Sequence, residues 1–73
     1  MALFRNLQCR ALMIAGSRTS IALEPQFWKI ADKLSKAHGI SWQEWTERNL
    51  IKHNIKNNRA SALRVAILEE ILS

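Results

Sequence analysis

The 73-residue sequence contains one cysteine, one proline and two glycines, and it has no tyrosine. The lone cysteine, Cys9, excludes a disulfide within the chain and favours a reducing compartment, so we expect a cytoplasmic protein. No Cys/His group has the spacing of a metal site. A glycine-rich phosphate loop and a catalytic triad are also missing. We therefore expect no metal, no cofactor and no catalytic residue, and thus no enzyme.

Long apolar runs and early acidic residues are absent too. No segment approaches the roughly 20 apolar residues of a membrane-spanning helix. The short apolar run at residues 12–15 is smaller than the core of about 7–15 residues that a signal peptide needs. The first acidic residue is Glu24, and three arginines precede it. We interpret residues 1–16 as an N-terminal basic arm or an additional strand, and residues 17–73 as the folded domain. A targeting peptide is the less favoured alternative.

The charge balance is strongly basic, with 11 Lys and Arg against 6 Asp and Glu, a net charge of +5. Such a surface attracts phosphate backbones or anionic membranes. A chain this short buries too little surface to be very stable alone, and small domains then depend on a disulfide, a metal or a second subunit. With the first two excluded, we expect a homodimer.

One segment has the pattern of a strand. Residues 18–23 alternate, with Thr19, Ile21 and Leu23 on one face and small or polar residues on the other. Gly16 and Ser17 precede this segment and can form a tight turn. A single strand cannot satisfy its backbone hydrogen bonds. We therefore predict that it pairs with its two-fold copy in an antiparallel ribbon, which fits the major groove of B-DNA.

Three helices should follow the strand. Pro25 suits a first helical turn, and Gly39 suits a left-handed cap at the end of that helix. Ser41 and Glu44 have the spacing of a capping box, which begins a second helix over about residues 42–55. A third helix over about residues 59–72 is apolar on nearly all sides, so it must pack on two neighbours, one of them from a second subunit.

These elements predict a mostly α fold with one β-strand, in which apolar positions at helical spacing form the core. The residues that we assign to the core or to the dimer interface are Ile21, Leu23, Phe27, Leu34, Trp45, Leu50, Leu63 and Ile67.

The chain resembles the ribbon-helix-helix DNA-binding family (the Arc/MetJ-like proteins), and most closely a bacterial branch of it. The resemblance covers about residues 17–68. Its most specific part is residues 18–28 (RTSIALEPQFW), followed by residues 39–41 (GIS) and 61–65 (SALRV). It implies an intertwined homodimer with an intermolecular two-stranded ribbon, to which this chain adds a C-terminal helix.

The resemblance also implies which residues meet DNA. The outward strand residues Arg18, Ser20 and Ala22 would contact bases, and the start of the second helix, at Ser41 and Trp42, would hold a phosphate. Ala22 departs from the long polar side chain that the family commonly has at that position, so we expect weak or narrow sequence readout there.

These observations predict a sequence-specific DNA-binding transcriptional regulator, a repressor, whose homodimers bind double-stranded DNA and can assemble further on it. The alternative is an antitoxin-like or other protein-interaction module on the same dimeric fold, with a protein partner. A membrane-surface protein is a less favoured reading, and we expect no membrane partner.

Overall fold

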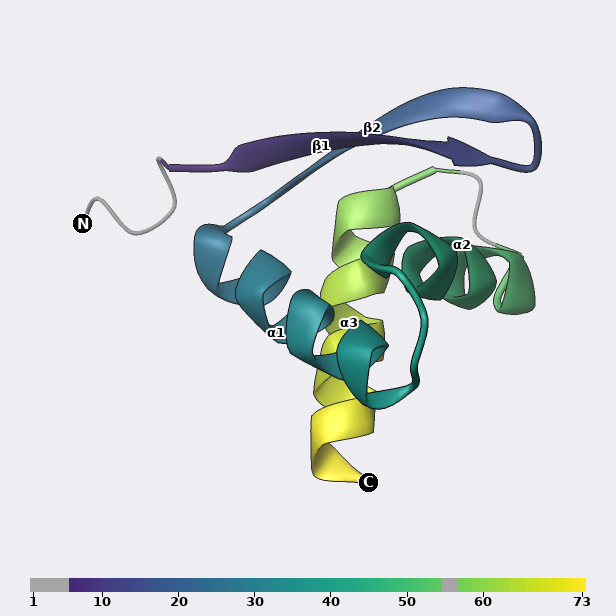
Figure 1. The fold of residues 1–73 in the computed structure, drawn as a ribbon. Coiled ribbons are helices and arrows are strands. Elements are labelled where there is room, and N and C mark those ends of the chain that lie inside the picture. Colours follow the sequence, from purple (N-terminus) through teal and green to yellow (C-terminus); the bar gives the residue numbers. More distant parts are fainter. Residues whose placement is uncertain (1–5, 55–56) are drawn as a thin grey trace.

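The computed structural model describes residues 6–54 and 57–73, which form a two-stranded hairpin lying across one end of three helices (Figure 1). In chain order the elements are β1 (Gln8–Ile14), β2 (Ser17–Leu23), α1 (Pro25–Ala37), α2 (Trp42–Lys52) and α3 (Arg59–Leu72). The first part of the predicted basic arm, residues 1–5, lies outside the described residues.

The hairpin corrects two predictions. We predicted one strand, whereas the structure has two: β2 pairs with β1 of the same chain in antiparallel register, from Gln8 opposite Leu23 to Ile14 opposite Ser17. In this two-stranded sheet β2 keeps one unpaired edge, so its pairing with a second copy stays a prediction. The turn is Ala15-Gly16 rather than Gly16-Ser17, with φ of 49° and 83° at its two central residues. Positive φ at both central positions is characteristic of a type I′ turn, whose twist matches that of a hairpin. One chain thus supplies both strands of this hairpin.

The helix ends follow the local signals of the sequence. Pro25 begins α1, and Gly39 follows it with a φ of 72°. The Ser41 hydroxyl accepts a hydrogen bond of 3.1 Å from the Glu44 N–H, as the capping box requires. The Glu44 carboxylate, however, binds Arg48 one turn further along α2. Helix α2 ends at Lys52, and Ile55, to which we had extended it, lies outside the described residues.

The core lies between the inner face of the hairpin and the three helices. Of the predicted core or interface residues, the structure buries Ile21, Leu23, Trp45, Leu50, Leu63 and Ile67. Phe27 and Leu34 are only half-buried, because α1 turns a different face inward. That face carries Trp28, Ala31 and Ser35. Trp28 is 1% exposed and is among the largest fully buried side chains.

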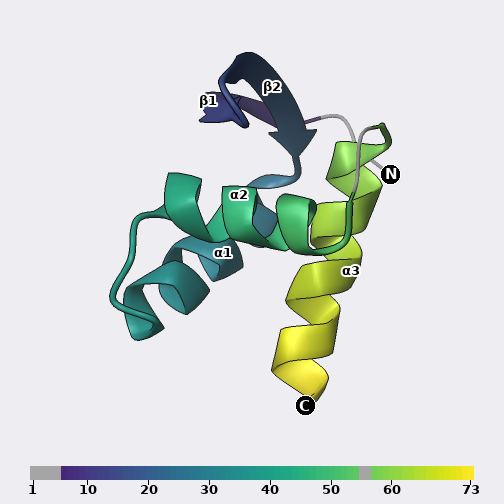
Figure 2. The same ribbon diagram turned by 90° about the vertical axis from the view of Figure 1, so that its right-hand side faces the viewer.

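Helix α3 runs away from the hairpin, with its first turn beneath β2 and its last turn at the far end of the molecule (Figures 1 and 2). Its inner face buries Leu63, Ala66 and Ile67. The opposite face leaves apolar side chains exposed, as a helix that is apolar on nearly all sides must do in a single chain. Within residues 6–54 and 57–73, no helix combines the length and apolar character that crossing a membrane requires.

Candidate nucleic-acid interface

The outer face of the hairpin is turned away from the helices. Because side chains alternate along each strand, this face takes every second residue, and the register places Met13 opposite Arg18, Ala11 opposite Ser20 and Cys9 opposite Ala22. Arg18 and Ser20 are exposed and Ala22 is half-buried. The face therefore carries one cationic group, mostly small side chains and no acidic group, and another molecule can approach its backbone closely.

Arg18 lies beside the start of α2. A hollow of about 560 Å³ separates the hairpin from this helix end, and it is lined by Ala11, Leu12, Met13, Arg18, Ser41 and Gln43. The first N–H groups of a helix have no partner within the helix, and the helix dipole favours an anion there. A predicted base contact, Arg18, and a predicted phosphate contact, Ser41, thus line one hollow. Gln43 joins them, and the sequence reading had missed it.

Trp42, the other predicted phosphate contact, turns its side chain toward the core. It is half-buried and its ring meets that of Trp28 edge to face, with 5.5 Å between the centroids. Any contact of Trp42 with an anion therefore falls to its backbone N–H rather than to its indole ring.

A clasp of four side chains, Arg10, Trp28, Asp32 and Trp42, ties the hairpin to the helices. The Arg10 guanidinium donates to both carboxylate oxygens of Asp32, at 2.8 and 3.0 Å. It also lies 4.7 Å from the ring centroid of Trp28 and 4.9 Å from that of Trp42. Such cation–π contacts are attractive and add to the ion pair. The clasp joins β1 to α1 and to the first turn of α2. It therefore connects the hairpin to the start of α2, and these are the two parts of the candidate interface.

Two further hydrogen bonds fix the hairpin at its ends. Trp28 Nε1 donates to the carbonyl of Gln8 at 2.7 Å, near the start of β1. At the turn, the Ala15 N–H donates to Oε2 of Glu47 at 3.0 Å. The outer face of the hairpin is thus held at a fixed orientation to the start of α2.

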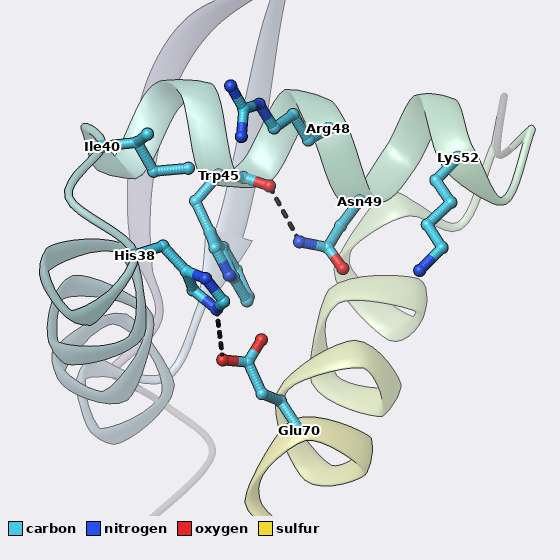
Figure 3. Close-up of a pocket in the computed structure, with 7 residues that line it drawn as sticks. All are labelled: His38, Ile40, Trp45, Arg48, Asn49, Lys52 and Glu70. Atoms are coloured by element: carbon cyan, nitrogen blue, oxygen red, sulfur yellow. Dashed lines mark hydrogen bonds and ion pairs between the residues drawn. The ribbon is translucent and has the colours of Figure 1, made fainter.

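A second hollow, of about 250 Å³, lies between the end of α1, α2 and α3 (Figure 3). The His38 ring and Oε2 of Glu70 are 2.7 Å apart across it, and Arg48 on its rim is paired with Glu44. Its floor residue, Trp45, is only 3% exposed. This hollow offers no open aromatic face, and its polar groups are largely engaged, so it adds nothing to the candidate interface.

Comparison with known protein families identifies the fold. A sequence-family model for the ribbon-helix-helix domain matches residues 7–71, nearly the whole chain. The chain belongs to the ribbon-helix-helix family. The resemblance read from residues 18–28 is thereby confirmed, and the match includes β1 and α3 as well.

A solved structure supports the arrangement of the elements. The structure of an uncharacterized protein from Bordetella pertussis Tohama I superposes with a TM-score of 0.78 at 28% sequence identity. The alignment covers 92% of this chain and 57% of that one, so this chain spans little more than half of its length. No curated protein matches the sequence.

Ribbon-helix-helix domains are non-enzymatic DNA-binding folds, and their members are typically regulators that bind DNA as dimers, or antitoxins. In the part of the chain that the structure describes, no three His, Cys, Asp or Glu side chains gather as a metal site would require. The outer face of the hairpin and the start of α2 are therefore the candidate binding surfaces.

Proposed function

We propose that this ribbon-helix-helix protein is a sequence-specific DNA-binding transcriptional regulator, a repressor, that acts as a homodimer. The observation that carries the proposal is the outer face of the hairpin, which has no acidic side chain and presents Arg18 beside Ser20. Within the described residues Arg18 makes no ion pair. Its charge is therefore available to a nucleic acid.

The major groove of B-DNA accepts a two-stranded ribbon that carries side chains of this kind. The groove of B-DNA is about 12 Å wide and admits a two-stranded ribbon. An arginine can make a bidentate contact to guanine, a serine can bond to several bases, and an alanine can touch a thymine methyl group. Arg18, Ser20 and Ala22 would read bases in this way.

The start of α2 would hold the neighbouring phosphate. The N–H groups of Ser41 and Trp42 lie at the positive end of the helix dipole, and the hollow beside them also carries Arg18 and Gln43. Such a contact fixes the orientation of the hairpin on the duplex, while the strand residues distinguish one sequence from another.

The test is duplex-DNA binding by the purified protein across a salt series, with Arg18→Ala compared against Lys36→Ala. Both substitutions remove one exposed cation, but Lys36 lies in the last turn of α1, away from the hairpin. We expect affinity to fall steeply with salt, because bound phosphates release counterions. Arg18→Ala should weaken binding by about tenfold, since a bidentate contact to a base is worth roughly 1–3 kcal/mol. Lys36→Ala should change affinity little.

A selection from random duplexes then tests sequence specificity. Enrichment of one sequence by the wild type, with relaxed preference in Arg18→Ala, is the expected result. Absence of binding even at low salt would reject the DNA-binding proposal. Equal losses in the two variants would mean that the charge acts without the hairpin.

A second candidate function is an antitoxin-like module that binds a protein partner. The exposed apolar side chains on the outer face of α3 favour it, because contiguous apolar surface commonly marks an interaction site. Co-purification of a distinct protein that is lost on substitution of that face, together with no DNA binding, would establish this alternative.

A further inference from the structure

Met13 is a large apolar side chain on a surface where most side chains are small. It lies on the outer face of β1 and is 55% exposed. The antiparallel register puts it directly opposite Arg18 on β2, the cation to which we assign a base contact. Methionine is unbranched and polarisable, so it adapts its shape to an irregular apolar surface. Met13 is therefore available to the same ligand as Arg18.

Met13 also lies between the two parts of the candidate interface. The hollow of about 560 Å³ between the hairpin and the start of α2 is lined by Met13 together with Arg18, Ser41 and Gln43. Of the two strands, β1 is the one that packs beside α2. A ligand that reaches from Arg18 to the start of α2 therefore passes over β1 and meets Met13.

The width of the ribbon indicates which part of DNA lies over β1. In the predicted pairing of β2 with a second copy, β1 is at the margin of a four-stranded ribbon. Neighbouring strands lie about 4.8 Å apart, so the two outer strands of such a ribbon are about 14 Å apart. The major groove is about 12 Å wide. The inner strands therefore face the bases, whereas β1 lies over the wall of the groove, which consists of sugars and phosphates.

We propose that Met13 is a further DNA-contacting residue, and that its side chain packs against a deoxyribose in the wall of the groove. The inference rests on the proposed function and adds a contact to it. The deoxyribose is the apolar part of the DNA backbone, and it joins the base to the phosphate. Arg18, Met13 and the start of α2 thus follow one another in the same order as the base, the sugar and the phosphate.

A contact with the sugar adds affinity but carries no sequence information. Every nucleotide of DNA has the same deoxyribose, so the contribution of Met13 does not depend on the base pairs beneath it. An apolar contact also releases no counterion, so its contribution does not depend on salt. These two properties distinguish Met13 from Arg18, which is charged and is assigned to a base.

The first test compares Met13→Ala with Ile51→Ala in duplex-DNA binding across a salt series. Both substitutions truncate an apolar side chain that is 55% exposed, but Ile51 lies on α2, outside the hollow. We expect Met13→Ala to weaken binding by about fivefold, the loss expected when part of an apolar side chain is no longer buried. The loss should be equal on the duplex that selection enriches and on its single base-pair variants, and the dependence of affinity on salt should not change. Ile51→Ala should bind as the wild type.

The second test looks for a gain in affinity, which a folding defect cannot produce. The ammonium group introduced by Met13→Lys would lie beside the phosphates of the groove wall. Binding should therefore tighten, and the slope of log affinity against log salt should steepen by about 0.9, the value for one further phosphate contact. Ile51→Lys adds the same charge on α2 and should change neither quantity appreciably. Equal effects of the two substitutions, or no effect of Met13→Lys, would overturn the proposal.

The contact of Met13 and the proposed function can fail separately. Salt-dependent binding that is weakened by Arg18→Ala but not by Met13→Ala would reject the sugar contact and leave the proposed function intact. Replacement of the thymines of the site by uracil removes only their methyl groups. If that replacement abolishes the difference between Met13→Ala and the wild type, Met13 lies on a base and the sugar contact is rejected. A wild type that binds no DNA at low salt would reject both proposals.

Discussion

The guanidinium group of Arg64 on α3 holds the carboxylate of Glu24, the residue between β2 and α1, through two hydrogen bonds of 2.9 and 3.1 Å. This bidentate pair spans 40 residues of sequence and joins the end of the hairpin to the third helix. The Arg64 side chain lowers the pKa of Glu24 below its ordinary value of 4.5, mainly through the hydrogen bonds to the charged form. The pair therefore makes folding depend on pH.

Replacement of Glu24 by Gln should remove that dependence. A carboxyl group whose pKa is lowered by folding stabilises the native state above its unfolded pKa, here 4.5, and this stabilisation is lost as the pH falls through the folded pKa. Glu24→Gln should therefore be less stable than the wild type at pH 7. The difference should shrink as the pH falls below 4.5. Urea unfolding at a series of pH values measures it, and a constant difference across the series would contradict the role of this charge.

Replacement of Arg10 by Ala should loosen the hairpin. The clasp combines an ion pair with Asp32 and contacts over two tryptophan rings. Because the ion pair is partly exposed, we expect a loss of about 1–2 kcal/mol in the free energy of unfolding, most of it from the cation–π contacts. Faster hydrogen exchange of the β1 amides should accompany the loss. Arg10→Lys keeps the charge without the planar fork and should fall between the two proteins; equal behaviour of Arg10→Lys and Arg10→Ala would contradict a contribution of the charge itself.

Replacement of Ala15 by Asn should stabilise the chain. Ala15 has a φ of 49° in the hairpin turn, a conformation that costs a residue with a Cβ roughly 1–2 kcal/mol unless a short polar side chain can bond locally. Asn-Gly is the preferred pair for this turn. We expect Ala15→Asn to raise the midpoint of thermal unfolding, while Gly16→Ala should lower it because of its φ of 83°. A lower midpoint in Ala15→Asn would contradict this assignment of the turn.

Two adjacent residues of α3 should respond differently to truncation. Ile67 is fully buried and Leu68 is 48% exposed. Ile67→Ala should cost about 3 kcal/mol through lost burial and the cavity left behind. Leu68→Ala should cost less than about 0.5 kcal/mol in the monomer, as surface substitutions do. Unfolding at low protein concentration isolates the monomer, since dimerisation adds stability that depends on concentration. Similar losses at the two positions would contradict the assignment of Ile67 to the buried face of α3 and of Leu68 to its exposed face.

The sequence predicted the elements whose signals are local. Alternation over residues 18–23, proline at the first turn of α1, glycine after its last turn and the serine cap of α2 all act within a few residues. The third helix was predicted at its observed bounds, Arg59–Leu72, because an apolar pattern of that length has one interpretation. These signals were enough for the helical part of the fold.

The strand β1 was only one of two alternatives for residues 1–16, because its inward face contains a charge. Arg10 shares that face with Leu12 and Ile14, and an arginine among apolar residues interrupts the alternation that marks a strand. It is tolerated there because Asp32 and two tryptophans receive it, and these lie about 20 to 30 residues away along the chain. No pattern within a few residues of Arg10 could predict such partners. Gln43 was missed for a similar reason, because its place beside Arg18 depends on packing between segments that are far apart in the sequence.

The sequence also did not show which face of α1 packs on the core. Phe27 and Trp28 are adjacent and lie on different faces of the helix, and the apolar spacing favoured the face of Phe27 and Leu34. The structure buries Trp28 instead, because its indole N–H reaches the Gln8 carbonyl on β1. That hydrogen bond requires β1, which the sequence offered only as an alternative, so the burial of Trp28 could not be predicted.

A ribbon closed by the Ala15-Gly16 turn also changes how the protein can assemble. The two strands are joined by the shortest common hairpin connection, so their pairing is a local event of the kind that takes about 1–10 μs. A ribbon made from two separate chains must instead wait for an encounter, and its formation slows as the protein becomes dilute. In this chain the pairing of β1 with β2 is unimolecular, so the hairpin forms at any expression level before a second copy arrives.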